Sequence, residues 1–163
     1  MDLLNEEERY SKFISLIQLR EIVFEGVRCE RNGDFQNSNP SLDIALEYKV
    51  EDALQTELKI VFPFQFKVKA HVNQSEEELS YNMIEPENTL FNIELDMQLE
   101  YLLNIDEVDT TMVTEDYASV LEIFAERNVT LNAWPYVREI IHDLTMKMGL
   151  SALVIPLKKF PSL

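Results

Sequence analysis

Residues 58–72 read LKIVFPFQFKVKAHV, and the fold class follows from the spacing of the apolar residues in this stretch. Apolar side chains recur at every second position, with lysine, glutamine or histidine at most positions between them. A two-residue period is typical of a β-strand with one buried face, because successive side chains of a strand point to opposite sides of the sheet. The predicted buried set is Leu58, Ile60, Phe62, Phe64, Phe66, Val68, Ala70 and Val72.

Two further stretches, residues 42–50 and 91–103, alternate in the same way. The polar positions of residues 58–72 are rich in lysine, whereas those of residues 91–103 are rich in glutamate and aspartate. Opposite charges facing each other are expected of neighbouring antiparallel strands. A fourth stretch, residues 13–25, is also predicted to be a strand, and a β-bulge would explain the change of its pattern near Gln18.

The last third of the chain changes to the helical period of 3.6 residues. A short helix is expected after Thr114, a capping residue, with an apolar stripe formed by Tyr117, Val120, Leu121 and Phe124. A longer helix is predicted to begin near Pro135 and to end at Gly149, followed by an apolar segment over residues 150–157. Strands followed by helices predict one α+β domain over residues 1–163.

Composition narrows the classes of function. The chain has 163 residues, an apolar share of 46% and a formal net charge of −16. Such an acidic chain is not expected to bind nucleic acid or anionic membrane surfaces, both of which require clustered lysine and arginine. The polar, acidic run at residues 5–9 is unlike a secretory leader, and no apolar stretch is long enough for a membrane insertion. The single cysteine, Cys29, suits a reducing compartment, so a cytoplasmic location is expected.

No group of residues in the sequence predicts catalysis. The chain holds two histidines, one cysteine and three isolated glycines, so a glycine-rich phosphate loop is not expected. His142 has no second histidine at the spacing of a zinc protease, and Cys29 is interpreted as a structural or incidental thiol. The many carboxylates are explained by charged strand faces and helix ends. We therefore expect no catalytic residue, no metal site and no cofactor.

The sequence offers more apolar surface than one helix with a single apolar stripe covers. Phe62, Phe64 and Phe66 follow one another on one strand, and Trp134 and residues 150–157 add to this surface. Most of these side chains are expected in the core. The surplus is expected to meet another subunit, a client polypeptide, or both.

Three motifs then resemble a known family. WPYVRE at residues 134–139, followed by a helix closing at Gly149 and by LVIP at residues 153–156, resembles the helix region of SecB, the bacterial export chaperone, which carries an aromatic-Pro-Tyr-Ala-Arg-Glu segment there. REIVFE at residues 20–25 is similar to the first strand of SecB, and LDI at residues 42–44 to the start of its second strand. The resemblance extends from about residue 13 to residue 160.

The resemblance implies a four-stranded antiparallel sheet with helices packed on one face. It also implies a chaperone that assembles as a dimer or a dimer of dimers and holds unfolded polypeptides in apolar grooves without ATP, with a role in protein export. The implied polypeptide-binding residues are Phe35, Phe62, Phe64, Phe66, Trp134, Leu153 and Ile155. The implied oligomer contacts are Ile93, Leu95 and Met97, and the acidic residues that would face the SecA translocation motor are Glu21, Glu25 and Glu94.

Two departures from the family pattern bear on this interpretation. SecB continues past the final proline into a second long helix and an acidic tail that engages SecA, whereas this sequence ends at Leu163. Gln98 and Leu99 stand where the family has paired glycines. A divergent SecB-like protein is therefore expected, and binding of SecA stays open. The alternatives are a SecB-like chaperone dedicated to one partner such as an antitoxin, a structural oligomer without clients, and a small enzyme.

Overall fold

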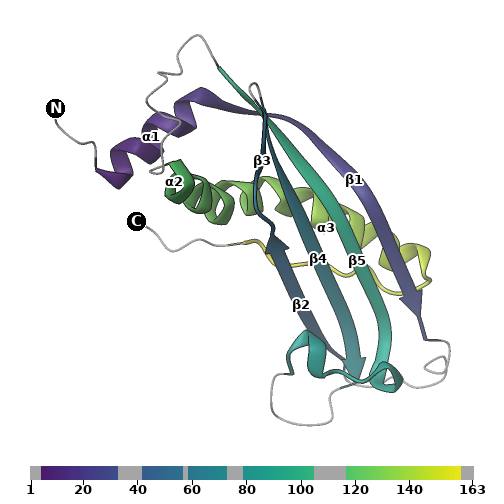
Figure 1. Ribbon diagram of the computed structural model, residues 1–163. Helices are drawn as coiled ribbons and strands as arrows, with labels where there is room; N and C mark the ends of the chain where they lie inside the picture. Colours follow the sequence, from purple (N-terminus) through teal and green to yellow (C-terminus); the bar gives the residue numbers. More distant parts are fainter. Residues whose placement is uncertain (1–4, 33–41, 57–58, 73–78, 105–116, 159–163) are drawn as a thin grey trace.

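The computed structural model describes residues 5–32, 42–56, 59–72, 79–104 and 117–158 (Figure 1). One antiparallel sheet contains the strands β1 (Ile17–Arg31), β2 (Leu42–Val50), β3 (Leu54–Gln55), β4 (Lys59–Val72) and β5 (Thr89–Leu103). The order across the sheet is β1-β5-β4-β2, and the short β3 pairs with β4 beyond the end of β2. The predicted antiparallel α+β architecture is confirmed, with the fourth place in the sheet shared by β2 and β3.

The two central strands form the core as their alternation predicted. β4 and β5 are neighbours, with Phe64 opposite Met97 on the apolar face and Lys67 opposite Glu94 on the polar face. Every second residue of both strands is buried, from Ile60 and Tyr101 at one end of the sheet to Ala70 and Phe91 at the other. Burial of these apolar side chains is the main driving force for folding.

The N-terminal stretch differs from the prediction of one strand over residues 13–25. Helix α1 (Glu6–Leu16) occupies its first residues, and β1 begins only at Ile17. A capping box begins the helix, because the Glu8 amide donates to Asn5 Oδ1 (2.9 Å) and the Asn5 amide donates to the Glu8 carboxylate (3.0 Å). The Asn-x-x-Glu signature at residues 5–8 is the sequence signal of this helix.

β1 is an edge strand that pairs with β5 alone among the described residues. Its register shifts between Leu19 and Glu21 and again between Phe24 and Gly26. The predicted irregularity near Gln18 is therefore found slightly later in the chain and is accompanied by a second one. Both shifts add residues to β1 relative to β5, which bends the edge strand.

The helical part runs without interruption from Tyr117 to Lys147. Helix α2 (Tyr117–Phe124) continues through a π-helical turn, η6 (Ala125–Val129), into helix α3 (Thr130–Lys147). The predicted start near Pro135 is thus wrong: Pro135 lies inside α3. Val129 and Ala133 are buried before it, so packing of the preceding turn extends the helix in the N-terminal direction. Thr114, the predicted cap, lies outside the described residues.

Gly149 ends this helix as predicted. It has a φ of 73°, and its amide donates to the Met146 carbonyl, while the Leu150 amide donates to the Thr145 carbonyl. This pair of hydrogen bonds is the Schellman motif, whose left-handed residue is usually glycine. Residues 150–158, here called the C-terminal segment, then run back along α3 without regular secondary structure.

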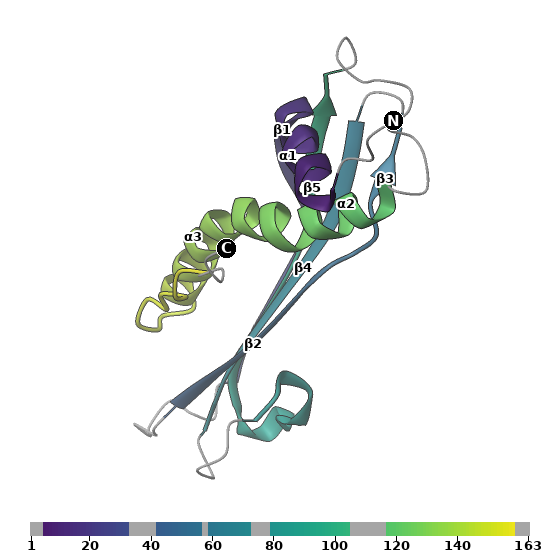
Figure 2. The same ribbon diagram turned by 90° about the vertical axis from the view of Figure 1, so that its left-hand side faces the viewer.

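The two faces of the sheet are covered differently. Figure 2 shows the helices on one side of the sheet and a shorter connection on the other. This connection contains the 3₁₀ turns η2 (Tyr81–Met83) and η3 (Pro86–Asn88). Tyr81 fixes it to the polar face, since its hydroxyl donates to Asn92 (2.5 Å) and the Lys69 ammonium lies 4.1 Å from its ring centre.

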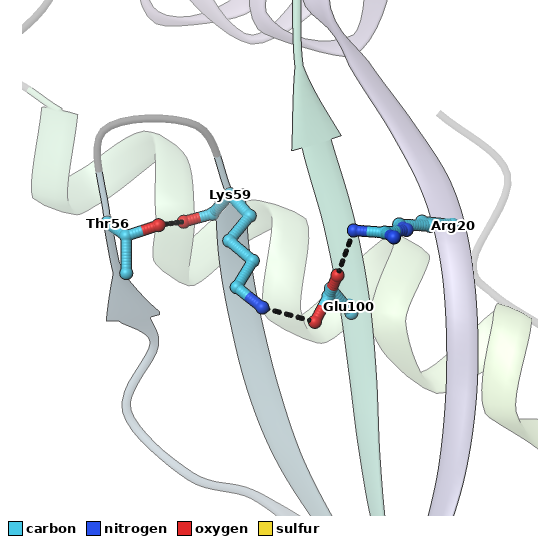
Figure 3. Close-up of polar contacts among 4 residues, drawn as sticks. All are labelled: Arg20, Thr56, Lys59 and Glu100. Carbon is cyan, nitrogen blue, oxygen red and sulfur yellow. Dashed lines mark hydrogen bonds and ion pairs between the residues drawn. The ribbon is translucent and has the colours of Figure 1, made fainter.

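A charged cluster crosses the uncovered half of the polar face. Glu100 of β5 accepts from Arg20 of β1 (3.0 Å) and from Lys59 of β4 (2.7 Å), as Figure 3 shows. Thr56, also drawn in Figure 3, links β3 to the start of β4: its hydroxyl donates to the Lys59 carbonyl (3.3 Å), and its amide donates to the same carbonyl (2.8 Å). The cluster links the three strands β1, β5 and β4.

We predict that Glu100 makes folding sensitive to acid. The hydrogen bond from Lys59 is the largest cause that lowers the pKa of Glu100; desolvation opposes it, and the charges of Lys59 and Arg20 lower it further. A carboxylate with a lowered pKa stabilises the fold above its ordinary pKa of about 4.3, and this contribution is lost as the pH falls through the folded-state pKa. The difference in unfolding free energy between the wild type and Glu100→Gln should therefore shrink as the pH falls below this value. The exposed Glu139→Gln variant is the control, and an equal pH dependence in both variants would contradict the prediction.

Candidate polypeptide-binding groove

A groove of about 1430 Å³ lies between the outer edge of the sheet and the helical run. One wall is formed by the end of β2 and the connection to β3, residues 48–53. The other wall is formed by α2, η6 and the first turn of α3. Since β2 pairs only with β4 among the described residues, the groove borders a free strand edge.

Aromatic side chains form the floor of the groove. Tyr48 stacks on Phe64, with ring centres 6.1 Å apart, and meets Trp134 edge-on at 5.6 Å. Phe62 closes the floor towards α2. These rings position one another, because edge-to-face and stacked pairs each contribute about 0.5–1.5 kcal/mol beyond area burial. The floor is thus a continuous set of aromatic contacts.

The helical wall contributes apolar residues of α2, η6 and α3 to the groove, beside the polar Asn128 and Thr130. Leu121 of α2 is half-buried, and Leu131 of α3 is 46% exposed. Ala118 and Ala125, the small residues of this wall, leave the space open. The π-helical turn between α2 and α3 forms the middle of the wall, and such turns frequently occur at functional sites.

Charged side chains form the rim. The acidic members are Glu51, Asp52, Glu122 and Glu126, and the basic members are Lys49, Arg127 and Lys158. Lys49 pairs with Glu51 (2.6 Å), and Arg127 lies over the ring of Tyr10 at 5.4 Å. Burial raises the pKa of the Tyr10 hydroxyl, with Arg127 acting in the opposite direction. An apolar floor with charged residues around its rim can hold an apolar polypeptide segment while the flanking residues of that polypeptide remain in water.

The structure brings part of the predicted polypeptide-binding set together. Phe62 lies in the groove floor, Phe64 and Phe66 are buried beneath Tyr48 and Trp134, and Trp134 is itself buried. The two predicted members of the C-terminal segment, Leu153 and Ile155, pack on the same core. Phe35 lies outside the described residues. The client-binding role of all seven residues stays a prediction.

The residues predicted to contact another subunit or SecA lie elsewhere. Ile93, Leu95 and Met97 are buried in the core of their own chain, so their side chains do not reach its surface. Glu21 and Glu25 are exposed on β1, and Gln98 donates to Glu25 (2.5 Å). Glu94 lies within 3.8 Å of Arg28 and accepts from the Tyr81 hydroxyl (3.3 Å). The assembly and docking roles of these residues stay predictions.

Sequence reasoning missed the groove itself. Tyr48 and Val50 were recognised as members of an apolar strand face, and Leu121 as part of a helical stripe, but nothing local indicated that they face each other. The one sequence signal for a groove was the surplus of apolar residues, which exceeds what one helix with a single apolar stripe can cover. Leu131 gave no separate signal, because the helix was predicted to begin after it.

Within the ranges that the structure describes, no three histidine, cysteine, aspartate or glutamate side chains are grouped as a metal site requires. Over the same residues, no helix combines the length and the apolar character needed to cross a bilayer.

A comparison with solved structures finds a match over nearly the whole chain. No protein-family model and no curated protein matches the sequence. Among solved structures, the SecB-like chaperone Rv1957 of Mycobacterium tuberculosis, in complex with a ChAD peptide from the HigA1 antitoxin (Rv1956), matches with a TM-score of 0.69 and 16% identity over 93% of this chain and 98% of that chain.

A second solved structure is much more distant. It is a protein of unknown function from Streptococcus agalactiae, with a TM-score of 0.35 and 7% identity over 86% of this chain and 97% of that chain. The likeness to Rv1957 concerns the backbone and covers nearly all of both chains. Together with the sheet order and the helices on one face, it confirms the resemblance read from the motifs: this chain has the fold of the SecB-like chaperones.

Proposed function

We propose that this chain is an ATP-independent chaperone that holds a segment of an unfolded polypeptide in the groove between the β2–β3 edge and the α2–η6–α3 run. The observation that carries the proposal is an open groove with an aromatic floor, beside an edge of β2 that pairs with no strand in the described part of the chain. Its volume of about 1430 Å³ exceeds the roughly 300–1,000 Å³ that small-molecule pockets occupy. An extended chain of several residues fits such a space better than a small metabolite does.

The chemistry of the groove suits a polypeptide of variable sequence. Apolar side chains gain about 25 cal/mol for each Å² that they bury, whatever their identity, so the floor and the helical wall accept many sequences. The free edge of β2 offers backbone hydrogen bonds that are equally independent of sequence. Capture by these two interactions needs no bound nucleotide. Cytoplasmic, unfolded or partly folded chains are the clients that fit.

We propose that the chaperone works as a homo-oligomer joined through β1. β1 is an edge strand, and Ile22, Phe24 and Val27 lie on its apolar face with partial or full exposure. Pairing of two such edges would cover this surface and join two sheets into one. Several grooves on one assembly would then bind different segments of one client, which raises the overall affinity through effective concentration.

A second candidate function is a chaperone dedicated to one partner. The likeness to Rv1957, which was solved with a peptide of an antitoxin, supports this alternative to general holding or export. Docking to the SecA motor would depend mainly on Glu21, because Glu25 accepts from Gln98 and Glu94 is engaged by Arg28 and Tyr81. Binding measured for several unrelated unfolded chains separates the two: a general chaperone binds them with similar affinity, and a dedicated one binds a single partner.

The decisive test is a charge placed in the groove. Leu131→Asp should weaken binding of an unfolded polypeptide, such as reduced and carboxymethylated α-lactalbumin, by at least about tenfold, because burial of one leucine side chain is worth about 1.5–3 kcal/mol. Fluorescence anisotropy of the labelled polypeptide gives the dissociation constant. Loss of protection against aggregation, followed by light scattering, should accompany the weaker binding.

Leu102→Asp is the matched control for this test. Leu102 is 38% exposed, close to the 46% of Leu131, but it lies on the polar face of the sheet, on the central strand β5 and away from the β1 edge. The two variants therefore introduce the same charge at similar exposure on opposite sides of the molecule. Equal binding by both variants would reject the groove as the client site, and absence of binding by the wild type would reject the function.

A further inference from the structure

The C-terminal segment is held against α3 in the way that a bound peptide is held. The side chains of Trp134 and Arg138 donate to two consecutive backbone carbonyls, those of Pro156 (2.7 Å) and Ile155 (2.7 Å). Nearer the start of the segment, the Leu153 amide donates to Thr145 Oγ1 (3.0 Å). Within the described residues the segment belongs to no strand, so its backbone is recognised by side chains of one helix.

These three residues of α3 form a row. Trp134 and Arg138 are separated by four positions and Arg138 and Thr145 by seven, so all three side chains lie on one face of the helix. Thr145 is fixed in place because its hydroxyl donates to the Ile141 carbonyl (2.9 Å) and its side chain is buried. The row thus offers hydrogen-bonding groups to the backbone of an extended segment. None of these three hydrogen bonds involves a side chain of the segment.

Ile155 is the principal anchor of the segment. It is fully buried in the core cluster, and Leu150 and Leu153 pack against the same cluster while partly buried, whereas Val154 and Leu157 are 60% and 68% exposed. Alternation of buried and exposed side chains over residues 153–155 is the pattern of an extended chain lying on a surface. Lys158 then reaches the open groove, with its ammonium 4.4 Å from the ring centre of Tyr48.

The segment and the open groove are therefore two parts of one trough. Tyr48 and Lys158 line the groove, and Trp134, which contacts Tyr48 edge-on, binds the segment. Figure 1 shows the C-terminal segment passing along α3 towards the end of β2, where the wall of the groove begins. The part of the trough along α3 is filled by the chain itself, and the part along α2 is open.

We infer that the trough along α3 is a second polypeptide-binding subsite, occupied by the chain's own C-terminal segment, which an extended client displaces. This inference rests on the proposed function of the open groove. The ligand is an extended polypeptide with one aliphatic side chain in the place of Ile155 and two consecutive carbonyls facing Trp134 and Arg138. A proline is accepted directly after the anchor, because Pro156 contributes only its carbonyl to these contacts.

Hydrogen–deuterium exchange on the full chain tests the displacement. With saturating reduced and carboxymethylated α-lactalbumin, residues 117–131 should exchange more slowly, because the client covers the open groove. Residues 150–158 should exchange faster, because the Leu153 amide loses its acceptor when the segment leaves α3. Slower or unchanged exchange of residues 150–158 while the client is bound would overturn the inference and leave the groove function intact.

Two variants and a control measure the competition directly. Ile155→Ala removes the anchor and should lower the dissociation constant of the client at least fivefold. Thr145→Val, which keeps the shape of the residue but removes the acceptor for Leu153, should act in the same direction. Val154→Ala, one position from the anchor, should leave affinity unchanged. Equal affinity in all three variants would overturn the inference. Absence of client binding in the three variants and in the wild type would instead reject the proposed function.

Discussion

Replacing Phe64 with alanine is expected to lower the free energy of unfolding by about 3–5 kcal/mol. Phe64 is 0% exposed, lies opposite Met97 in the centre of the sheet and stacks on Tyr48. The substitution removes the ring and leaves a cavity that the two central strands cannot close without losing their register. Such a loss is a large part of the roughly 5–15 kcal/mol that stabilises an ordinary domain. Urea unfolding followed by circular dichroism measures the change.

Gln65→Ala is the control for Phe64→Ala. Gln65 is the next residue of β4 and lies on the polar face, so its truncation should change the unfolding free energy by less than about 1 kcal/mol. A cost of less than about 1 kcal/mol for Phe64→Ala would contradict its place in the core. The result also bears on client binding: because Phe64 is a core residue, a variant at this position tests folding, and the groove itself is tested at Leu131.

Phe13→Ala is expected to have the second large effect on stability. The loss should be confined to the packing of α1. Phe13 is 1% exposed and meets Tyr117 and Phe124 edge-on, with ring centres 5.5 Å and 5.2 Å away. Loss of a buried phenylalanine costs about 3–5 kcal/mol, but α1 packs mainly on α2 and is not part of the sheet. We therefore expect α1 to detach while the sheet stays folded, since stability is distributed unevenly over a structure.

Limited proteolysis distinguishes local from global unfolding. Trypsin should cleave Phe13→Ala after Arg9 or Lys12 at least tenfold faster than it cleaves the wild type, while the unfolding transition of the sheet moves little. Ile14→Ala is the control, because Ile14 is the adjacent residue and is 39% exposed. Unchanged cleavage at these sites would show that Phe13 does not hold α1 in place.

Much of the sheet was predictable because its signals are local. Alternation of apolar and polar residues identified β2, β4 and β5, and the opposite charges on two of them predicted that they are neighbours. The left-handed position of Gly149 was also predictable, since glycine adopts it without strain. These features depend on residues close together in the sequence or on one repeated pairing.

The errors arose where distant packing decides local structure. Phe13, Ile14 and Leu16 are apolar and adjoin a strand, but contacts with α2 and the cap at Asn5 make this stretch helical. Pro135 suggested a helix start, yet the buried residues before it extend the helix to Thr130 and through η6. The groove depends on residues 48–53 meeting residues 118–131, a juxtaposition about 70 positions apart that no local pattern encodes.

The charge of the edge strand has a consequence for how copies of this chain approach one another. β1 carries three arginines (Arg20, Arg28 and Arg31) and three glutamates (Glu21, Glu25 and Glu30), a local balance of zero in a chain of net charge −16. At low ionic strength the negative charge on the rest of the chain repels a second copy over roughly 30 Å. Electrostatic repulsion is therefore weakest when the second copy approaches the neutral edge at β1. Added salt shortens that range to about 8 Å at 0.15 M. Electrostatics thus orients encounters towards β1 and makes their frequency rise with ionic strength.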